Sequence, residues 1–230
     1  MALGETMPLS RLHMASAAGL AALILSACGQ PAPPPAEAPA EPAAEAAAAA
    51  PVVETASFEP QAEDFRCIRD MHPVRGFFVD NLLGDLEATI AVAESETGGV
   101  YPPGSVVQLV PGEVMVKREA GFSAETKDWE FFELDVSAEG SAIRVRGTHD
   151  AVNQFGGNCL ECHAKAEPQW DLVCEQTHGC DPIPLTPVMV KAIQNTDPRC
   201  PPVENLPQDQ IEALELLAFI REAAEENQAP

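Results

Sequence analysis

The chain is poor in basic side chains, in aromatic side chains and in long apolar runs. It has 13 Lys and Arg against 36 Asp and Glu, which gives a formal net charge of -23. Because nucleic acid binding needs clustered Lys and Arg, this balance excludes nucleic acid, and it excludes an anionic bilayer as an electrostatic partner. A basic protein or a small neutral molecule is a better partner for the negative electrostatic field of such a chain. Aromatic residues make up only 5% of the chain and lie after residue 57.

The apolar run near the N-terminus is too short to span a membrane. It covers residues 14–25, about a dozen residues, whereas a spanning helix needs about 20. The run follows Arg11 and ends in Leu-Ser-Ala-Cys at 25–28, which predicts a signal peptide over residues 1–27. A Cys after two small residues resembles a bacterial lipobox, in which Cys28 is diacylated. We expect an exported lipoprotein that faces the periplasm or cell exterior and touches the membrane through its lipid anchor only. An ordinary secretory signal is the alternative.

The next segment has nothing to bury. Residues 29–51 hold 11 Ala, 7 Pro and 3 Glu, with one Gly and one Gln. Such a composition predicts a disordered or partly polyproline tether. We therefore divide the chain into a signal peptide, a lipidated Cys with its tether over residues 28–62, and a folded domain over residues 63–230.

Short apolar runs separated by Pro and Gly turns predict an α+β domain, mainly an antiparallel β-sheet with flanking helices. Thr186 followed by Pro187 is typical of a helix start, with Thr as the N-cap. We expect a short helix over 64–71, strands over 89–92, 105–110, 114–117, 128–137 and 143–146, and helices over 186–194 and 207–226.

The strongest chemical signal is a C-x-x-C-H sequence at residues 159–163, near the C-terminal end of the predicted sheet. Its spacing lets the thiols of Cys159 and Cys162 add to the vinyl groups of one haem, while the imidazole of His163 reaches the iron. Chance supplies about 0.005 such matches in this composition. Export strengthens the prediction, because covalent haem attachment takes place outside the bacterial cytoplasm. We expect one covalently bound haem c.

Other arrangements of the same cysteines stay open. A zinc knuckle would combine Cys159 and Cys162 with Cys174 and Cys180, or with His178, although these spacings match no common zinc pattern. A pair of disulfides with an incidental His is a second alternative. A small all-helical cytochrome c is disfavoured, since its C-x-x-C-H lies near the start of the domain, whereas here a long extended pattern precedes it.

Four cysteines remain after the lipid and haem cysteines. In an oxidising compartment they usually pair, and four cysteines allow three connectivities. We favour Cys174 with Cys180, which closes a short loop, and Cys67 with Cys200, which ties the first segment of the domain to its C-terminal segment. A free pair with redox chemistry is the alternative.

Several short segments together resemble the cytochrome P-460 family, exported mono-haem proteins with a β-rich domain and the haem motif near its C-terminal end. The resemblance implies that Cys159 and Cys162 hold the haem, that His163 is the proximal ligand, and that a homodimer forms. The matching pieces are Tyr-Pro-Pro-Gly-Ser-Val-Val at 101–107, Val-Met-Val-Lys at 114–117, Asp-Trp-Glu-Phe-Phe at 128–132, the haem motif and Asp-Leu-Val at 171–173.

The chain departs from that family at two places. Some members carry a lysine cross-linked to the porphyrin and oxidise hydroxylamine, and related members bind nitric oxide at a five-coordinate iron. Leu109 stands near the place of that lysine, and Lys117 and Lys127 are the nearest substitutes. Cys174 stands where the family usually has an aromatic residue, which fits an additional disulfide.

Three functions are compatible with these residues. The first is electron transfer to a basic redox partner protein. The second is an oxidoreductase that acts on a small nitrogen compound such as hydroxylamine or nitric oxide, and the third is a sensor or scavenger of such a ligand. For the second, Glu130 is the candidate catalytic carboxylate, because alternation places it with Phe132 and Leu134, where burial would raise its pKa. A solvated residue at the strand end is the alternative for Glu130.

The second axial position of the iron has no obvious protein ligand. We expect His149 to be exposed in a polar turn and His178 to be held at the surface by a short disulfide loop. The remaining sequence favours a predominantly five-coordinate haem with an apolar wall from the sheet. The candidate side chains are Met71, His72, Met115, His149, His178 and Met189.

Overall fold

We analysed a computed structural model of the chain, which describes residues 57–175 and 177–228. The predicted signal peptide, Cys28 and almost all of the predicted tether lie outside the described residues. Within the described part of the chain, no helix is both long enough and apolar enough to cross a bilayer. Packing begins before Glu63, since the backbone carbonyl of Phe58 accepts a hydrogen bond from Arg118 at 2.6 Å.

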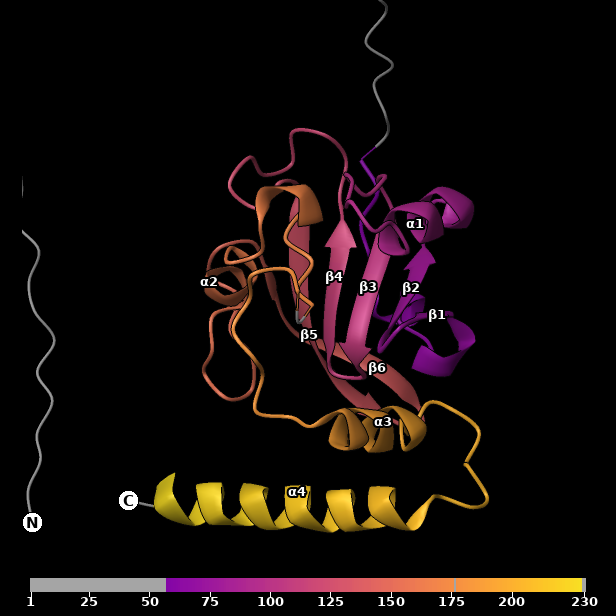
Figure 1. The fold of residues 1–230 in the computed structure, drawn as a ribbon, viewed down its shortest axis with the longest axis vertical. Helices are drawn as coiled ribbons and strands as arrows, with labels where there is room; N and C mark the ends of the chain where they lie inside the picture. Colours follow the sequence, from indigo (N-terminus) through magenta and orange to yellow (C-terminus); the bar gives the residue numbers. More distant parts are fainter. Residues whose placement is uncertain (1–56, 176, 229–230) are drawn as a thin grey trace, which may run out of the picture. The chain divides into compact units, whose positions relative to one another are not determined.

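Six strands form one antiparallel sheet in which each strand pairs with the next along the chain (Figure 1). This order follows from tight turns such as Pro111-Gly112, because antiparallel neighbours need only a few connecting residues. Gly140, at φ 132°, opens the last hairpin in a backbone region that suits glycine. The strands are β1 His72–Val74, β2 Phe77–Asn81, β3 Ser105–Val110, β4 Glu113–Lys117, β5 Trp129–Ser137 and β6 Gly140–Gly147.

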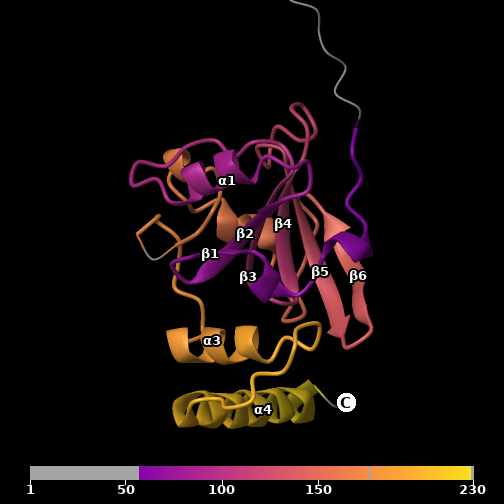
Figure 2. The same ribbon diagram turned by 90° about the vertical axis from the view of Figure 1, so that its right-hand side faces the viewer.

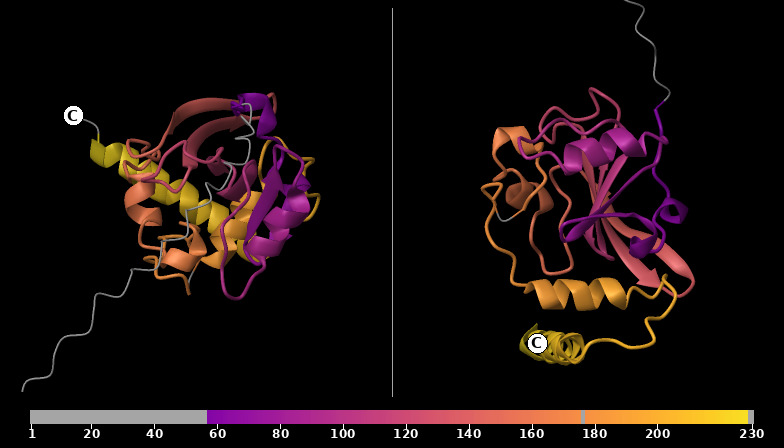
Figure 3. Two further views of the ribbon diagram at one scale, coloured as in Figure 1. Left: turned by 90° about the horizontal axis from the view of Figure 1, so that it is seen from above. Right: turned by 45° about the vertical axis from the view of Figure 1, so that its right-hand side comes forward.

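Helices lie against the sheet at both ends of its strands. The helix α3 contacts β3 and α4, so it lies between the sheet and α4 (Figure 2). A second view shows α1 at the opposite end of the strands (Figure 3). The helices are α1 Leu86–Ala93, α2 Cys159–His163, α3 Pro187–Asn195 and α4 Gln208–Gln228, and the 3-10 turns are η1 Ala62–Asp64, η2 Ile68–Asp70 and η3 Pro168–Trp170.

Both faces of the sheet are buried. One face, which we call the α2 face, includes Met115, Trp129 and Phe131, and the partly buried Cys159 and Leu160 of α2 pack against it. The opposite face carries a second apolar cluster, which contains Val106, Val114, Val116, Phe132 and Leu134. Strand alternation separates these two sets, as the sequence predicts for residues 128–137.

Two predicted elements were wrong. The segment 89–92 is helical in α1, because Thr89 is buried and its hydroxyl donates to the carbonyl of Asp85 at 3.1 Å and lies 2.8 Å from the hydroxyl of Ser105. The local bond to Asp85 and the tertiary contact with Ser105 together outweigh the β preference of the branched residues. The segment 64–71 forms the turns η1 and η2 instead of one helix, since the backbone N–H of Ile68 donates to Asp197 at 3.0 Å.

The structure of the C-terminal part agrees closely with the prediction from sequence. The hydroxyl of Thr186 accepts a hydrogen bond from the backbone N–H of Met189 at 3.2 Å and caps α3 as predicted. α3 and α4 share an apolar cluster of Met189, Ala192 and Ala213. The disulfides are Cys67–Cys200 and Cys174–Cys180, the two pairings that the sequence analysis favours.

Candidate functional site

The C-x-x-C-H residues form the short helix α2. Asn158 caps it, because its side-chain oxygen accepts a hydrogen bond from the backbone N–H of Glu161 at 2.9 Å. Residues three and four positions apart share one side of a helix, so Cys159, Cys162 and His163 project from neighbouring positions. Both cysteines are free thiols and half-buried.

His163 is oriented by the backbone. Its Nδ1 lies 2.8 Å from the carbonyl oxygen of Leu172. Since a carbonyl only accepts hydrogen bonds, Nδ1 carries the proton and Nε2 keeps its lone pair. Burial lowers the pKa of His163, and the contact with Leu172 opposes this effect. A neutral imidazole with a backbone-bound Nδ1 is the form that coordinates metals.

The Leu172 carbonyl is itself held by an unusual turn. Asp171 and Leu172 have φ values of 50° and 66°, a left-handed region that side chains other than Gly seldom adopt. The Asp171 carboxylate accepts hydrogen bonds from the backbone N–H of Tyr101 at 3.0 Å and from Nζ of Lys117 at 2.8 Å. The carbonyl of Asp171 accepts the indole N–H of Trp129 at 2.6 Å. Tyr101 and the strands β4 and β5 therefore fix the turn that orients His163.

The two substitutes for a cross-linking lysine both have partners. Nζ of Lys117 forms the buried ion pair with Asp171, and Nζ of Lys127 donates to the carbonyl of Pro168 at 3.0 Å. Leu109, near the place of the family's lysine, packs at the margin of the α2-face cluster. In this arrangement both amines act as hydrogen-bond donors to the segment 168–171.

The site is closed by the sheet on one side. The rings of Phe131 and His163 have centroids 5.3 Å apart. Met115 is the cross-strand partner of Phe131 and is buried in the same cluster. Burial, and to a smaller extent the charges of Glu113 and Glu133, raise the pKa of Cys159 to about 11. The thiol of Cys159 therefore stays protonated at neutral pH, unlike a low-pKa redox cysteine.

Glu130, the predicted catalytic carboxylate, lies on the opposite face of the sheet from α2. Alternation does place it with Phe132, but that face is turned away from the C-x-x-C-H residues. Its two oxygens accept hydrogen bonds from Arg146 at 2.7 and 2.9 Å, and Arg118 donates to it as well. Glu130 anchors two arginines, and its position gives it no access to α2.

The sequence analysis missed a different carboxylate, Glu133. It is 2% exposed, shares the α2 face with Phe131, and lies directly across the strand pair from Glu113. Burial, and then the charge of Glu113, raise the pKa of Glu133 to about 7. Arg144 donates to one oxygen at 2.6 Å, and the other oxygen, Oε1, is buried without a hydrogen-bond partner. The signal that could have identified Glu133 is strand alternation, which places it on the same face of β5 as Trp129.

Two of the cysteines proposed as zinc ligands are not free thiols. Cys174 and Cys180 are joined in a disulfide, so neither thiolate is available to a metal. Among residues 57–175 and 177–228, no three His, Cys, Asp or Glu side chains are grouped to hold a metal ion. His178, expected at the surface, is 5% exposed and stacks on Trp170 with a centroid distance of 3.7 Å. His149 is exposed, as expected.

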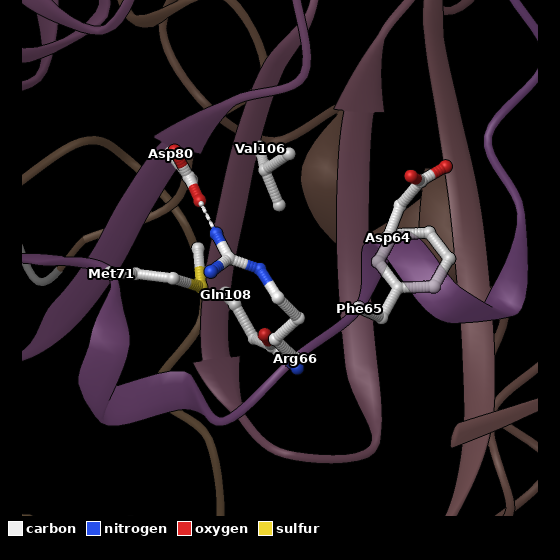
Figure 4. Close-up of a pocket in the computed structure, with 7 residues that line it drawn as sticks. All are labelled: Asp64, Phe65, Arg66, Met71, Asp80, Val106 and Gln108. Carbon is white, nitrogen blue, oxygen red and sulfur yellow. Dashed lines mark hydrogen bonds and ion pairs between the residues drawn. The ribbon is translucent and has the colours of Figure 1, made fainter. Parts of the chain in front are cut away.

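Two small cavities lie away from α2. The first is on the opposite face of the sheet, and the ion pair of Arg66 and Asp80 at 3.2 Å crosses it (Figure 4). The second is bounded by Tyr101, Trp170 and His178. No residue of α2 lines either of them.

The donor set of α2 fits a haem c. Two free thiols at the required spacing stand beside a neutral imidazole whose Nε2 keeps its lone pair, and the adjoining sheet surface is apolar. In comparisons with known proteins, no family model, no curated protein and no solved structure matches the chain.

Proposed function

We propose that this chain is a membrane-tethered, mono-haem c-type cytochrome that resembles the cytochrome P-460 family. The observation that carries the proposal is the hydrogen bond of 2.8 Å from His163 Nδ1 to the Leu172 carbonyl, in a helix that also bears two free thiols. An iron ligand needs Nε2 with a free lone pair, which this hydrogen bond provides. His178 makes a similar contact to a backbone carbonyl, so the proposal depends on combining this tautomer with the two free thiols of α2. The exported, lipid-anchored location belongs to the same proposal and rests on residues 11–28.

Each residue has a defined role in this proposal. Cys159 and Cys162 form the thioether bonds, and His163 supplies the proximal nitrogen. Phe131 and Met115 exclude water from the sheet side of α2. Once bound, the haem supplies a one-electron carrier whose iron can also accept a small ligand.

Electron transfer to a basic redox partner is the function that the geometry supports best. Lys117 is buried in its pair with Asp171, and Lys127 donates to a backbone carbonyl. An amine with such partners is a poor candidate for a porphyrin cross-link, and hydroxylamine oxidation in the family is associated with that cross-link. A plain haem c with an acidic protein surface meets the needs of an electron carrier.

A second candidate is an oxidoreductase, or a binding protein, for hydroxylamine or nitric oxide. The observation that favours it is the buried Oε1 of Glu133, which has no hydrogen-bond partner and lies on the α2 face. A carboxyl group whose pKa is about 7 can hold or release a proton at neutral pH. Turnover of hydroxylamine with an electron acceptor separates this candidate from simple electron transfer.

Intact-mass analysis tests the proposal. Protein produced with a haem-attachment system should gain the mass of one haem, and the double variant Cys159→Ala, Cys162→Ala should gain none. The double variant Cys174→Ala, Cys180→Ala is the matched control, since it removes the same number of cysteines and should retain haem. Stoichiometric zinc, or haem retained without Cys159 and Cys162, contradicts the proposal. The optical spectrum of the ferrous protein then distinguishes a plain haem from a cross-linked one.

A further inference from the structure

A tight turn presents the carbonyl that accepts the hydrogen bond of His163. The backbone N–H of Val173 donates to the carbonyl of Trp170 at 2.9 Å and closes this turn. The two residues between them, Asp171 and Leu172, have φ values of 50° and 66°. Two positive φ values are typical of a type I′ turn, in which Gly and Asn are the favoured residues. Leu seldom adopts this backbone form unless the surrounding structure holds it there.

One group that holds the turn is the carboxylate of Asp171, and a second is the side chain of His178. The ring of His178 stacks on Trp170, the first residue of the turn, with a centroid distance of 3.7 Å and an interplanar angle of 4°. Its Nδ1–H donates to the carbonyl of Val173, the last residue of the turn, at 2.8 Å. A single imidazole therefore bridges both ends of the turn.

The position of His178 is itself fixed. His178 is 5% exposed, and its backbone carbonyl accepts a hydrogen bond from the backbone N–H of Glu167 at 2.7 Å. It lies between Cys174 and Cys180, which are joined in a disulfide. Sγ of Cys174 lies 3.8 Å from the carbonyl oxygen of Cys162. The loop that carries His178 is therefore anchored beside the C-terminal end of α2.

We propose that His178 is a positioning residue for His163 and acts through the turn of residues 170–173. This inference rests on the proposed function, because it concerns the proximal ligand of the same site. The two imidazoles bind consecutive carbonyl groups, since His163 donates to Leu172 and His178 donates to Val173. The iron would bind Nε2 of His163, whereas these contacts are made through its Nδ1. They therefore do not compete with a bound haem.

The alternative role for His178 is that of an axial ligand, because its Nδ1 also donates to a backbone carbonyl. Its surroundings favour the positioning role. Trp170 covers one face of the ring, and Nε2 lies 3.7 Å from a carboxylate oxygen of Glu175. The other oxygen of Glu175 accepts a hydrogen bond from Nε of Arg75 at 2.7 Å. Nε2 of His178 therefore faces a paired carboxylate.

The first arm of the test measures the tautomer of His163 in the absence of haem. The full chain with Cys159→Ala and Cys162→Ala is isotope-labelled, and NMR should show the proton of His163 on Nδ1. His178→Phe keeps a ring for the stack and removes the hydrogen-bond donor. It should shift the proton of His163 toward Nε2. It should also speed solvent exchange of the Val173 amide about fivefold, because the turn loses one hydrogen bond.

Three controls accompany this measurement. His178→Asn keeps an amide donor for the Val173 carbonyl, so it should restore the tautomer of His163. His149→Phe removes an exposed imidazole and should leave the tautomer unchanged. Amide exchange in β4 reports opening of the sheet and should be the same in all variants. An unchanged tautomer in His178→Phe, no recovery in His178→Asn, an equal change in His149→Phe, or equally faster exchange in β4 would overturn the inference.

The second arm uses the haem-loaded protein. A weaker hydrogen bond at Nδ1 makes the imidazole a less basic ligand. His178→Phe should therefore lower the iron–histidine stretching frequency of the ferrous protein, measured by resonance Raman spectroscopy, and raise its reduction potential. His149→Phe should change neither. A low-spin ferrous spectrum that becomes high-spin in His178→Phe would overturn the inference and identify His178 as an axial ligand.

The two arms together separate this inference from the proposed function. If no haem attaches but His178→Phe still shifts the tautomer of His163, the proposed function fails and the control of His163 by His178 stands. If haem attaches and His178→Phe leaves the tautomer, the stretching frequency and the reduction potential as in the wild type, the inference alone fails.

Discussion

His163 donates the hydrogen of its Nδ1 to the carbonyl oxygen of Leu172, 2.8 Å away, and Leu172 adopts a φ of 66° to present that oxygen. Because the acceptor belongs to the backbone, the tautomer of His163 depends on the shape of the turn and not on the side chain at position 172. This turn is held by the carboxylate of Asp171, which accepts hydrogen bonds from Tyr101 and from Lys117 of the sheet. The stability of this small region should therefore depend strongly on one buried ion pair.

Replacing Lys117 tests that dependence. Lys117→Met leaves the carboxylate of Asp171 buried without its cation, and both side chains are at most 6% exposed. We expect the free energy of unfolding to fall by about 3 kcal/mol or more, measured by urea denaturation with the disulfides intact. Lys165→Met, which removes the lysine of the exposed pair with Asp181, should leave the urea midpoint unchanged. Equal effects from the two variants would show that burial of the pair does not matter.

The sheet was largely predictable from sequence, and the reason lies in its local signals. Residues 105–117 and 128–146 combine apolar alternation with Pro-Gly and Glu-Gly turns, and each such signal acts within a few residues. The prediction for segment 89–92 was wrong because its branched residues favour a strand, while the buried contact of the Thr89 hydroxyl with Ser105 comes from a residue 16 positions away. Tertiary contacts of this kind leave no local pattern.

The grouping of Cys159, Cys162 and His163 was predictable, and its surroundings were not. The spacing of these three residues is local, so the sequence alone shows that they share one side of a short helix. Strand alternation correctly separates Glu130 from Glu133, but it does not tell which face of the sheet receives α2. His178 was placed at the surface because a short disulfide loop is usually exposed, whereas its stacking on Trp170 buries it.

Glu133 should make stability depend on pH. Its pKa is raised from the ordinary 4.5 to about 7 in the folded protein, so the folded state binds more protons than the unfolded state between these pH values. The stabilising contribution of the protonated carboxyl is therefore complete below about pH 4.5 and is lost as the pH rises through 7, by about 3 kcal/mol. Glu133→Gln should remove this part of the decline in unfolding free energy, measured by urea titrations across the range.

Two variants complete that measurement. Glu113→Gln removes the neighbouring charge, so it should lower the pKa of Glu133 and shift the decline to lower pH. Glu212→Gln, on the exposed surface of α4, should leave the profile unchanged. A Glu133→Gln profile that coincides with the wild-type profile would show that Glu133 does not titrate in this range.

The two disulfides should differ in their effect on stability. Cys67 and Cys200 are 133 residues apart, whereas Cys174 and Cys180 are six apart. In the loop-entropy description, the longer loop constrains the unfolded chain more, which corresponds to about 5 kcal/mol against about 2 kcal/mol. Thermal or urea denaturation of the two double Cys→Ala variants measures the difference. A larger loss for the Cys174 and Cys180 variant would contradict this ranking.

Cys28 should determine where the protein resides. If it is lipidated, Cys28→Ser should release the protein from the membrane fraction or block processing of the precursor, because one residue supplies the acyl attachment. Fractionation with immunodetection, together with metabolic labelling by a fatty acid, measures both effects. A Cys28→Ser protein that stays membrane-bound and is processed normally would rule out the lipobox.

The last prediction concerns the second axial position of the iron. Of the six candidate side chains, Met115 shares the α2 face with Phe131, the residue whose ring contacts His163. Met115 is 5% exposed and packed among apolar side chains, which accounts for its burial without a metal. His178 is stacked on Trp170, and its Nδ1–H donates to the carbonyl of Val173 at 2.8 Å. His149 is exposed.

We therefore expect a predominantly five-coordinate haem. Carbon monoxide or nitric oxide should bind the ferrous protein in one fast phase, because no protein ligand has to leave first. Met115→Leu keeps the volume and removes the sulfur, so the ferrous spectrum and the binding rate should stay as in the wild type. Met189→Leu, in α3, is the matched control. A low-spin ferrous spectrum that becomes high-spin in Met115→Leu alone would identify Met115 as the sixth ligand and would favour an electron carrier without a ligand-binding function.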